Sequence, residues 1–270
     1  MNKKFRVACI QLNAGSDSEK NWQRLSLLLE KAGHLKCHLI ALPEVFAWRG
    51  PSKSLNRIAN YVSPLIIGRL QSWAKKSKTA LLLGSVLLPA KTRGKVTNTS
   101  LLINVKGKIL AAYHKIHLFD INCGNIKSRE TKEVQPGTKV VSVKMGDKLF
   151  GLSVCYDLRF PELYRSLAKK GVQIIFVPAN FTAYTGKAHW EVLLRARAIE
   201  NQVFIVAPAQ TGVHPGNKIK SYGNSLIVDP WGRILARGSH LGEEVLWTDL
   251  DFLAQKKLRK QFPVLNHRRL

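Results

Sequence analysis

Short apolar runs alternate with amphipathic segments along the whole chain, and this alternation constrains the fold more than any other feature of the sequence. In the first half, the run 6–12 is followed by the segment 17–36, whose apolar residues recur at helical spacing behind Asp17, a suitable N-cap. The same reading predicts the remaining elements of the first half: a helix over 63–76 and strands over 38–43, 79–88, 98–105 and 108–114.

The same order returns in the second half, after a polar connection over 121–137. The predicted helices span 160–170 and 187–202, and the predicted strands span 149–154, 172–177, 203–209, 225–228 and 233–237. Uninterrupted apolar strands need cover on both faces, from helices on one side and from a second sheet on the other. We therefore expect an α/β fold: a four-layer α-β-β-α sandwich of two mixed sheets with an internal pseudo-two-fold repeat.

The two halves are not separated by a linker rich in Pro, Gly or Ser, so the chain 1–270 is predicted to form a single domain. A basic C-terminal extension begins at about residue 255. We expect this extension to contain a final helix that packs against the body or against a partner.

The charge balance is unusual for a globular chain. The sequence has 43 basic and 17 acidic residues, which gives a net charge of +26, and such a protein attracts polyanions at low salt. The basic residues are spread along the chain, and the tryptophans do not alternate with them as a base-stacking platform requires. Specific nucleic-acid binding is therefore not indicated, although a basic nucleic-acid-associated protein on an enzyme fold stays open as a hypothesis.

Membrane and export signals are weak in this sequence. No apolar run approaches the roughly 18 residues that a membrane span requires. The segment 1–12 begins with basic residues, but Gln11 and Asn13 interrupt its apolar stretch and no small-residue cleavage site follows. We expect a cytoplasmic protein without membrane attachment.

Four cysteines lie far apart and form no C-x-x-C pair. This spacing argues against a zinc cluster and against a disulfide framework, so no metal site is predicted. Cys9 and Cys37 fall within or beside apolar strands and are expected in the core, whereas Cys123 is expected in an exposed loop.

A reactive side chain follows three of the apolar strands. Glu44 follows the strand 38–43, Lys115 follows 108–114 and Cys155 follows 149–154. Each residue alone has an ordinary structural explanation, but ligand sites of α/β sheets gather at the carboxyl ends of strands. A thiol becomes a nucleophile when a base takes its proton and a cation favours the thiolate, so these three residues form a coherent candidate site.

The segments around these residues resemble the three signature segments of the nitrilase superfamily, the carbon-nitrogen hydrolases. They are Leu42-Pro43-Glu44, the run 113–120 (YHKIHLFD) and the run 154–162 (VCYDLRFPE). Later segments are more similar to the branch whose members hydrolyse deaminated glutathione than to the nitrile-cleaving members or the ω-amidases: 185–200, 221–223, 229–232, 262–264 and 267–269. The resemblance covers nearly the whole chain.

The resemblance implies a role for each matching catalytic position. Cys155 corresponds to the nucleophile and Glu44 to the general base that later protonates the leaving amine. Lys115 and the backbone N–H of Tyr156 correspond to the groups that stabilise the tetrahedral oxyanion. Glu130 corresponds to a second glutamate that positions Lys115 and the substrate. The resemblance further implies that the reaction passes through a thioester acyl-enzyme and needs neither a metal nor an organic cofactor.

The resemblance also implies substrate contacts. Arg159 corresponds to an arginine that holds a substrate carboxylate, and Phe181 and Thr185 correspond to pocket positions. The chain departs from the pattern at Asn180, where we expect Ser or Ala, and at Lys187, where we expect Pro. The connection 121–126 is one residue shorter than expected and lacks a proline.

The leading hypothesis is therefore a cysteine-dependent amidase that acts on a small anionic 2-oxo amide, most specifically deaminated glutathione. An ω-amidase acting on 2-oxoglutaramate, or on another small N-acyl or N-carbamoyl amide, is the alternative within the same chemistry. The resemblance further implies a homodimer or a higher homo-oligomer.

Overall fold

Two six-stranded sheets form the centre of the protein in the computed structural model, which describes residues 4–124 and 126–269. The first sheet contains, in spatial order, β14 (Glu244–Leu250), β1 (Phe5–Gln11), β2 (Leu39–Ala41), β3 (Ala80–Pro89), β4 (Val96–Ile103) and β5 (Ile109–His114). The second sheet contains, in spatial order, β13 (Ile234–Arg237), β12 (Leu226–Val228), β11 (Phe204–Ala207), β10 (Ile174–Phe176), β9 (Lys148–Leu152) and β8 (Ser142–Met145).

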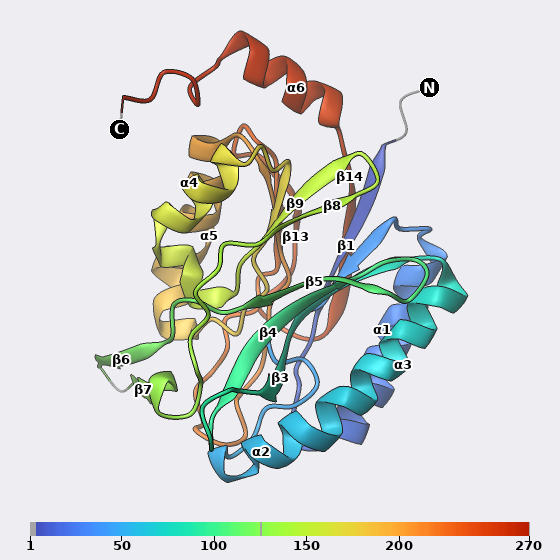
Figure 1. Cartoon of the computed structure of the whole chain (residues 1–270), viewed down its shortest axis with the longest axis vertical. Helices are drawn as coiled ribbons and strands as arrows, with labels where there is room; N and C mark the ends of the chain where they lie inside the picture. The colour runs from blue at the N-terminus through green and yellow to red at the C-terminus, as the bar shows by residue number, and fades with distance from the viewer. Residues whose placement is uncertain (1–3, 125, 270) are drawn as a thin grey trace.

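The sheets are covered by helices on their outer sides. The longer helices are α1 (Ser18–His34), α3 (Ser63–Ser77), α4 (Pro161–Lys169), α5 (Ala183–Asn201) and α6 (Phe252–Gln261). The short elements are the 3₁₀ turns η1 (Ser52–Ser54), η3 (Glu130–Lys132) and η4 (Cys155–Arg159), the helical turn α2 (Leu55–Arg57), the π-helix η2 (Ile58–Val62) and the hairpin of β6 (Asp120–Cys123) and β7 (Ile126–Arg129). Figure 1 shows α1 and α3 on one side of the sheets and α4 and α5 on the other.

The two sheets share one pairing pattern, which confirms the predicted internal repeat. In the first sheet β1, β2 and β3 are parallel neighbours, and β3, β4 and β5 are antiparallel neighbours. In the second sheet β9, β10 and β11 are parallel neighbours, and β11, β12 and β13 are antiparallel neighbours. An additional antiparallel strand pairs with the first strand of each repeat: β14 with β1, and β8 with β9.

Side-chain alternation divides the core into layers. Val7 and Cys9 of β1 belong to a cluster that also contains Phe150 and Leu152 of β9, so this cluster fills the space between the sheets. The intervening Ala8 and Ile10 belong to a second cluster with buried residues of α1 and α3. Because successive strand residues point to opposite faces, one apolar strand serves both clusters. The structure therefore confirms the predicted α-β-β-α sandwich.

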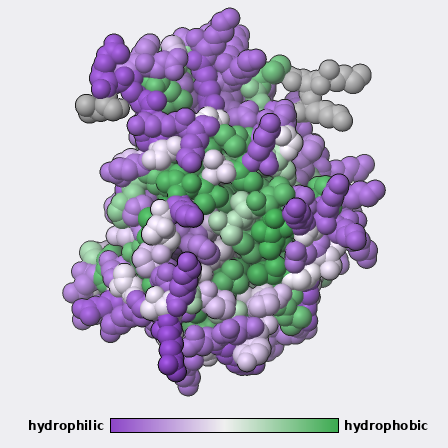
Figure 2. All heavy atoms as spheres, viewed as in Figure 1, coloured by the Kyte–Doolittle hydropathy of each residue, from purple (hydrophilic) through white to green (hydrophobic). Residues whose placement is uncertain are grey.

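The core reaches the surface at one open edge of the sandwich. Figure 2 shows hydrophobic side chains gathered in the middle of one face, where Figure 1 places β5, β8 and β9. Partly exposed residues of this region pack on the central cluster: Leu110, Ala111, Val140, Val141, Val143, Met145 and Leu149. Both β5 and β8 are terminal strands of their sheets, and Figure 2 shows hydrophilic side chains around the patch.

Several elements differ from the sequence-based predictions. Strands β8 and β14 and the hairpin β6–β7 were not expected, and α5 begins at Ala183 rather than at 187. Helix α6 begins at Phe252 rather than near 255, because Asp251 caps it by accepting bonds from the Leu253 and Ala254 backbone N–H groups. Asn125, within the shortened connection 121–126, lies outside the described residues.

Helix α6 packs against the body of the protein, as expected for the C-terminal extension. Gln255 Nε2 donates to the carbonyl oxygens of Gln173 and Gln202 at 2.9 and 3.0 Å. Arg259 Nη2 donates to the Val172 carbonyl at 2.7 Å. No helix within 4–124 and 126–269 is both long and apolar enough to cross a bilayer.

Gly84 of β3 allows the close approach that places the loop after β2. An ideal Cβ at Gly84 would lie 1.8 Å from the Leu42 carbonyl oxygen and 2.5 Å from that of Pro43. Only a residue without a side chain leaves room for Leu42 and Pro43, which lead directly to Glu44. The glycine therefore connects the packing of the first sheet with the candidate site.

We predict that Gly84→Ala lowers the free energy of unfolding by about 1–3 kcal/mol, since the added methyl group must displace backbone atoms. Urea denaturation followed by circular dichroism measures this change. The matched control is Gly68→Ala in α3, where nothing lies within 4 Å of an added Cβ. Removing an exposed glycine from a helix interior should raise the stability by roughly 0.5–1 kcal/mol. Equal effects of the two substitutions would contradict the packing argument.

Candidate active site

The structure brings Glu44, Lys115 and Cys155 to one cavity, as their positions after three strands predict. Glu44 follows β2, Lys115 follows β5 and Cys155 follows β9. The Leu42 backbone N–H continues the sheet by donating to the Leu82 carbonyl oxygen at 2.9 Å. The Lys115 backbone N–H likewise donates to the Asn98 carbonyl oxygen at 2.9 Å. Sheet-like bonds thus hold Lys115 and the segment that leads to Glu44.

Lys115 lies between two carboxylates. Its Nζ atom is 3.0 Å from Glu44 Oε1 and 2.8 Å from Glu130 Oε2, and its side chain is only 2% exposed. Burial lowers the pKa of this ammonium, but the attraction of Glu130 and Glu44 outweighs burial and raises the pKa well above its usual value. Lys115 is therefore a fixed positive charge at neutral pH.

Asn98 of β4 completes this cluster, and the sequence analysis did not identify it. Its Nδ2 atom donates to Glu44 Oε1 at 2.9 Å and to Glu130 Oε1 at 3.3 Å. The Phe119 backbone N–H donates to Glu130 Oε2 at 2.7 Å. The position expected for Glu130 from the resemblance thus lies directly against Lys115.

Cys155 begins the turn η4 with a φ angle of 49°, in the left-handed region that a non-glycine residue rarely adopts. Its backbone N–H donates to the Pro178 carbonyl at 2.9 Å, which holds the sharp turn after β9. Burial raises the pKa of the thiol well above its usual value, the Glu44 charge raises it further, and Lys115 opposes this effect. At neutral pH the thiol carries its proton next to the Glu44 carboxylate.

Asp157 links the Cys155 turn to the Lys115 strand, and it too was missed from the sequence. This fully buried carboxylate accepts from the Val154 backbone N–H at 2.8 Å, the Tyr113 hydroxyl at 2.7 Å and the His117 backbone N–H at 3.0 Å. Tyr113 and His117 flank Lys115 in the chain. An acidic residue two positions after the cysteine was visible in the sequence, but its partners depend on tertiary packing.

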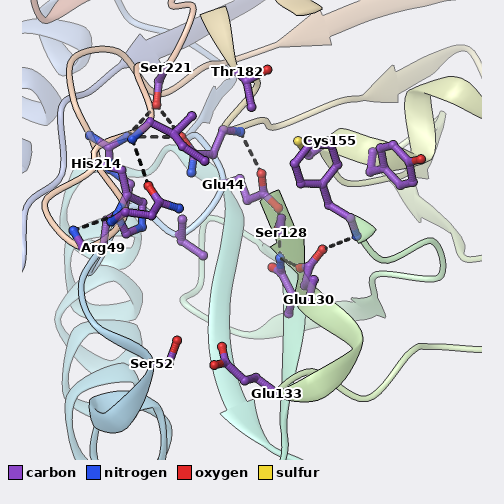
Figure 3. Close-up of a pocket in the computed structure, with 18 of the residues that line it drawn as sticks. Glu44, Arg49, Ser52, Ser128, Glu130, Glu133, Cys155, Thr182, His214 and Ser221 are labelled. Carbon is purple, nitrogen blue, oxygen red and sulfur yellow. Dashed lines mark hydrogen bonds between the residues drawn. The ribbon is translucent and has the colours of Figure 1, made fainter. Parts of the chain in front are cut away.

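The cavity around these residues has a volume of about 610 Å³. Figure 3 shows Arg49, His214 and Ser221 along one side, Cys155 and Glu130 along the other, and Glu44 between them. Ser52 and Glu133 lie farther out. A volume of this size accommodates a ligand considerably larger than a single carboxamide group.

Some of the residues expected to contact the substrate line the cavity, and one does not. Phe181, Thr185 and Tyr156 line the cavity. Arg159 is not among the lining residues: its guanidinium lies 5.2 Å from the centre of the Phe181 ring and 5.7 Å from that of Tyr156. Arg159 therefore supports two lining aromatic residues in this conformation.

Arg49 forms part of the opposite wall and was not identified from the sequence. It is 1% exposed, and its donors reach Ala14 O, Asn13 Oδ1, Thr211 O, Ser221 Oγ and Asn180 Oδ1. None of these partners is a carboxylate. Burial, with a smaller effect of Arg24, lowers the pKa of Arg49 to about 10. Arg49 therefore remains a cation at neutral pH.

The part of the chain that the structure describes contains no group of three His, Cys, Asp or Glu side chains that could hold a metal ion. All four cysteines are free thiols; Cys9 and Cys37 are buried, as expected, and Cys123 is exposed on β6. A thiol beside a carboxylate and an ammonium has the components for nucleophilic attack on a carbonyl group.

Comparisons with known proteins agree with the resemblance found in the sequence. The family model described as carbon-nitrogen hydrolase matches residues 6–260. A protein of Synechocystis sp. named deaminated glutathione amidase is 40% identical over 271 residues, covering 98% of this chain and 98% of that protein. The crystal structure of the C. elegans NitFhit protein has a TM-score of 0.91 at 37% identity, covering 100% of this chain and 66% of that one. The crystal structure of Saccharomyces cerevisiae Nit3, described as a member of branch 10 of the nitrilase superfamily, has a TM-score of 0.88 at 30% identity. The match covers 99% of this chain and 97% of that one. The chain therefore belongs to the carbon-nitrogen hydrolase family of the nitrilase superfamily.

Proposed function

We propose that this protein is a cysteine-dependent amidase that hydrolyses deaminated glutathione through a thioester acyl-enzyme. The observation that carries the proposal is the shared cavity of Cys155, Glu44 and Lys115, in which Lys115 Nζ lies 3.0 Å from Glu44. The site unites a nucleophile, a base and a cation that no single strand supplies. The name of the Synechocystis relative supports the choice of substrate.

In the proposed first half-reaction, Glu44 takes the proton of the Cys155 thiol while the sulfur attacks the amide carbonyl carbon. The carbonyl oxygen becomes an oxyanion, which the Lys115 ammonium and the Tyr156 backbone N–H stabilise. Collapse of this intermediate breaks the C–N bond, and Glu44 returns its proton to the departing nitrogen. The products are a thioester on Cys155 and a free amine.

In the second half-reaction, Glu44 removes a proton from a water molecule as its oxygen attacks the thioester carbonyl. Lys115 again stabilises the oxyanion, and Glu130 holds Lys115 in place through the contact at 2.8 Å. The C–S bond then breaks, and Glu44 passes the proton to the sulfur. The acid leaves, and the resting thiol is restored.

The charges around the cavity support an anionic substrate. Lys127, Arg129 and Lys132 line it from the hairpin β6–β7 and from η3, and they outnumber the nearby Glu133. Positive charge at the mouth of a cleft raises the local concentration of anions. Deaminated glutathione is a 2-oxo amide with carboxylates at both ends, so the positive charges at the mouth of the cavity would attract it.

We also propose that the protein functions as a homodimer or a larger homo-oligomer. Helix α5 supports this proposal, because Tyr184, Val192 and Ile199 are 61%, 66% and 47% exposed. Their spacing places them on one side of the helix. Apolar side chains gathered on one side gain free energy when a second copy covers them.

We predict that the purified protein hydrolyses deaminated glutathione with a higher kcat/KM than 2-oxoglutaramate. Both amides share one acyl group, so the ratio of their kcat/KM values compares the two leaving groups directly. Coupled assays of the released 2-oxo acid measure both rates. A clear preference for 2-oxoglutaramate would instead assign ω-amidase activity, and turnover of neither compound would refute the proposed substrate class.

We predict that Cys155→Ala lowers kcat by at least about 10⁴-fold, because no other group can form the thioester. Mass spectrometry of the quenched wild-type reaction should show the acyl adduct on the peptide that contains Cys155. The matched control is Cys123→Ala, which removes an exposed thiol that does not line the cavity. Full activity of Cys155→Ala, or loss of activity in Cys123→Ala alone, would contradict the mechanism.

We predict that Glu130→Gln lowers kcat about tenfold or more, because Lys115 loses its nearest charged partner while the amide still accepts from Phe119. Steady-state kinetics measure the effect. Glu133→Gln is the control: it removes a carboxylate that also lines the cavity but contacts no catalytic group, and its rate should stay within about twofold of wild type. Similar losses in both variants would point to a general loss of negative charge.

A further inference from the structure

Asn180 lies beside Glu44 and has a side chain that the mechanism above does not use. Its backbone N–H donates to Glu44 Oε2 at 2.7 Å, and its side chain lines the cavity. The residue lies between β10 and α5, in the segment that also carries Phe181. Asn180 thus occupies the wall next to the carboxylate that protonates the leaving amine.

The orientation of the Asn180 amide is fixed by two contacts. Arg49 Nη1 lies 3.1 Å from Asn180 Oδ1, and Ser221 Oγ lies 2.6 Å from the same atom. A guanidinium only donates hydrogen bonds, so the atom that faces Arg49 must be the oxygen. The Nδ2 group therefore points away from Arg49. It has no hydrogen-bond partner among the described residues and is not among their buried unpaired atoms, so it remains available to a ligand.

Arg49 also makes this amide a stronger donor. All the guanidinium donors contact neutral acceptors, so its charge is not balanced by a directly bonded carboxylate. A cation that bonds to an amide oxygen withdraws electron density from the group and polarises its N–H bonds. Such a donor prefers a strong acceptor, such as a carbonyl or carboxylate oxygen.

The geometry indicates which part of a substrate Asn180 meets. Glu44 returns a proton to the departing nitrogen, so this nitrogen must come within hydrogen-bond distance of Glu44. Asn180 is bonded to the same carboxylate through its backbone. The cavity also extends past Glu44 to Trp48, Ser52 and Glu133, which leaves room for a leaving group larger than ammonia.

We propose that Asn180 is a specificity-determining residue whose Nδ2 group donates to a carbonyl or carboxylate oxygen of the leaving amine. The protein then selects amides of amino acids or peptides over primary amides that release ammonia. Arg49 and Ser221 hold the amide in the orientation that this selection needs. This inference rests on the proposed Glu44 chemistry, but it does not depend on the identity of the acyl group.

The test compares two substrates that share an acyl group, the 2-oxoglutaryl amide of cysteinylglycine and 2-oxoglutaramate, in wild type and in two variants. Asn180→Ala removes the whole amide, whereas Asn180→Asp keeps an oxygen for Arg49 and Ser221, removes the donor and adds a negative charge. The ratio to be compared is kcat/KM for the peptide amide divided by kcat/KM for the primary amide. In both variants this ratio should fall about tenfold, which is the effect expected from the loss of one hydrogen bond. The control Asn60→Ala, on η2 and away from the cavity, should leave the ratio unchanged.

Two kinetic outcomes would overturn the inference. An unchanged ratio in both variants means that the side chain does not contact the leaving group. An equal loss for both substrates means that Asn180 acts only through the position of Glu44. Asn180→Ala separates these cases, because it adds no charge, whereas the charge added by Asn180→Asp acts on Glu44 and also repels the carboxylate of the peptide leaving group.

A binding measurement tests the inference even if the proposed substrate is wrong. Wild type that hydrolyses neither 2-oxo amide refutes the acyl assignment only. Calorimetric titration with cysteinylglycine, the leaving group itself, then gives an independent readout. Its affinity for wild type should exceed its affinity for Asn180→Ala about tenfold. Equal affinities, or no binding to wild type, would overturn the role of Asn180.

Discussion

The buried cluster of Glu44, Lys115 and Glu130 is the interaction on which the rest of the site depends. Removing two carboxylates and an ammonium from water costs several kcal/mol for each ion unless every polar atom finds a partner. Asn98 and the backbone N–H groups of Phe119 and Asn180 supply these partners. Asn98 lies on β4 of the first sheet, Phe119 follows β5 of that sheet, and Asn180 follows β10 of the second sheet, so the cluster forms only when the sandwich has assembled.

Charge balance explains why the opposite wall contains a buried guanidinium. The two carboxylates of the cluster exceed the single Lys115 charge by one negative charge. Arg49 restores neutrality from the far side of Glu44, and Asn180 connects the two, bonding Arg49 through its side chain and Glu44 through its backbone. The anionic substrate proposed above would therefore enter an inner site without net charge, whereas a negative inner site would repel it.

The sequence was sufficient to predict the elements with strong apolar periodicity and the residues at their ends. The repeated strand and helix order, and the positions of Glu44, Lys115 and Cys155 after three strands, follow from local patterns. Strands β8 and β14 were missed because edge strands are half solvated and carry charges, as in the sequence EVLWTDL of β14. Asn98 and Asp157 were missed for another reason. A buried polar residue is recognised by partners that are distant in the sequence, and no local pattern reveals them.

The same carboxylate governs both the resting state and the proposed reaction of Cys155. A buried thiol next to the negative Glu44 keeps its proton, and a protonated thiol resists oxidation and reacts slowly with stray electrophiles. In the proposed mechanism, Glu44 accepts the proton as a carbonyl group arrives, because Lys115 can then stabilise the negative charge that moves onto the substrate oxygen. The strained turn at Cys155, with its φ of 49°, keeps the sulfur at this junction of base and cation. The proposed mechanism therefore makes reactivity in this site a property of the complex with substrate rather than of the free cysteine.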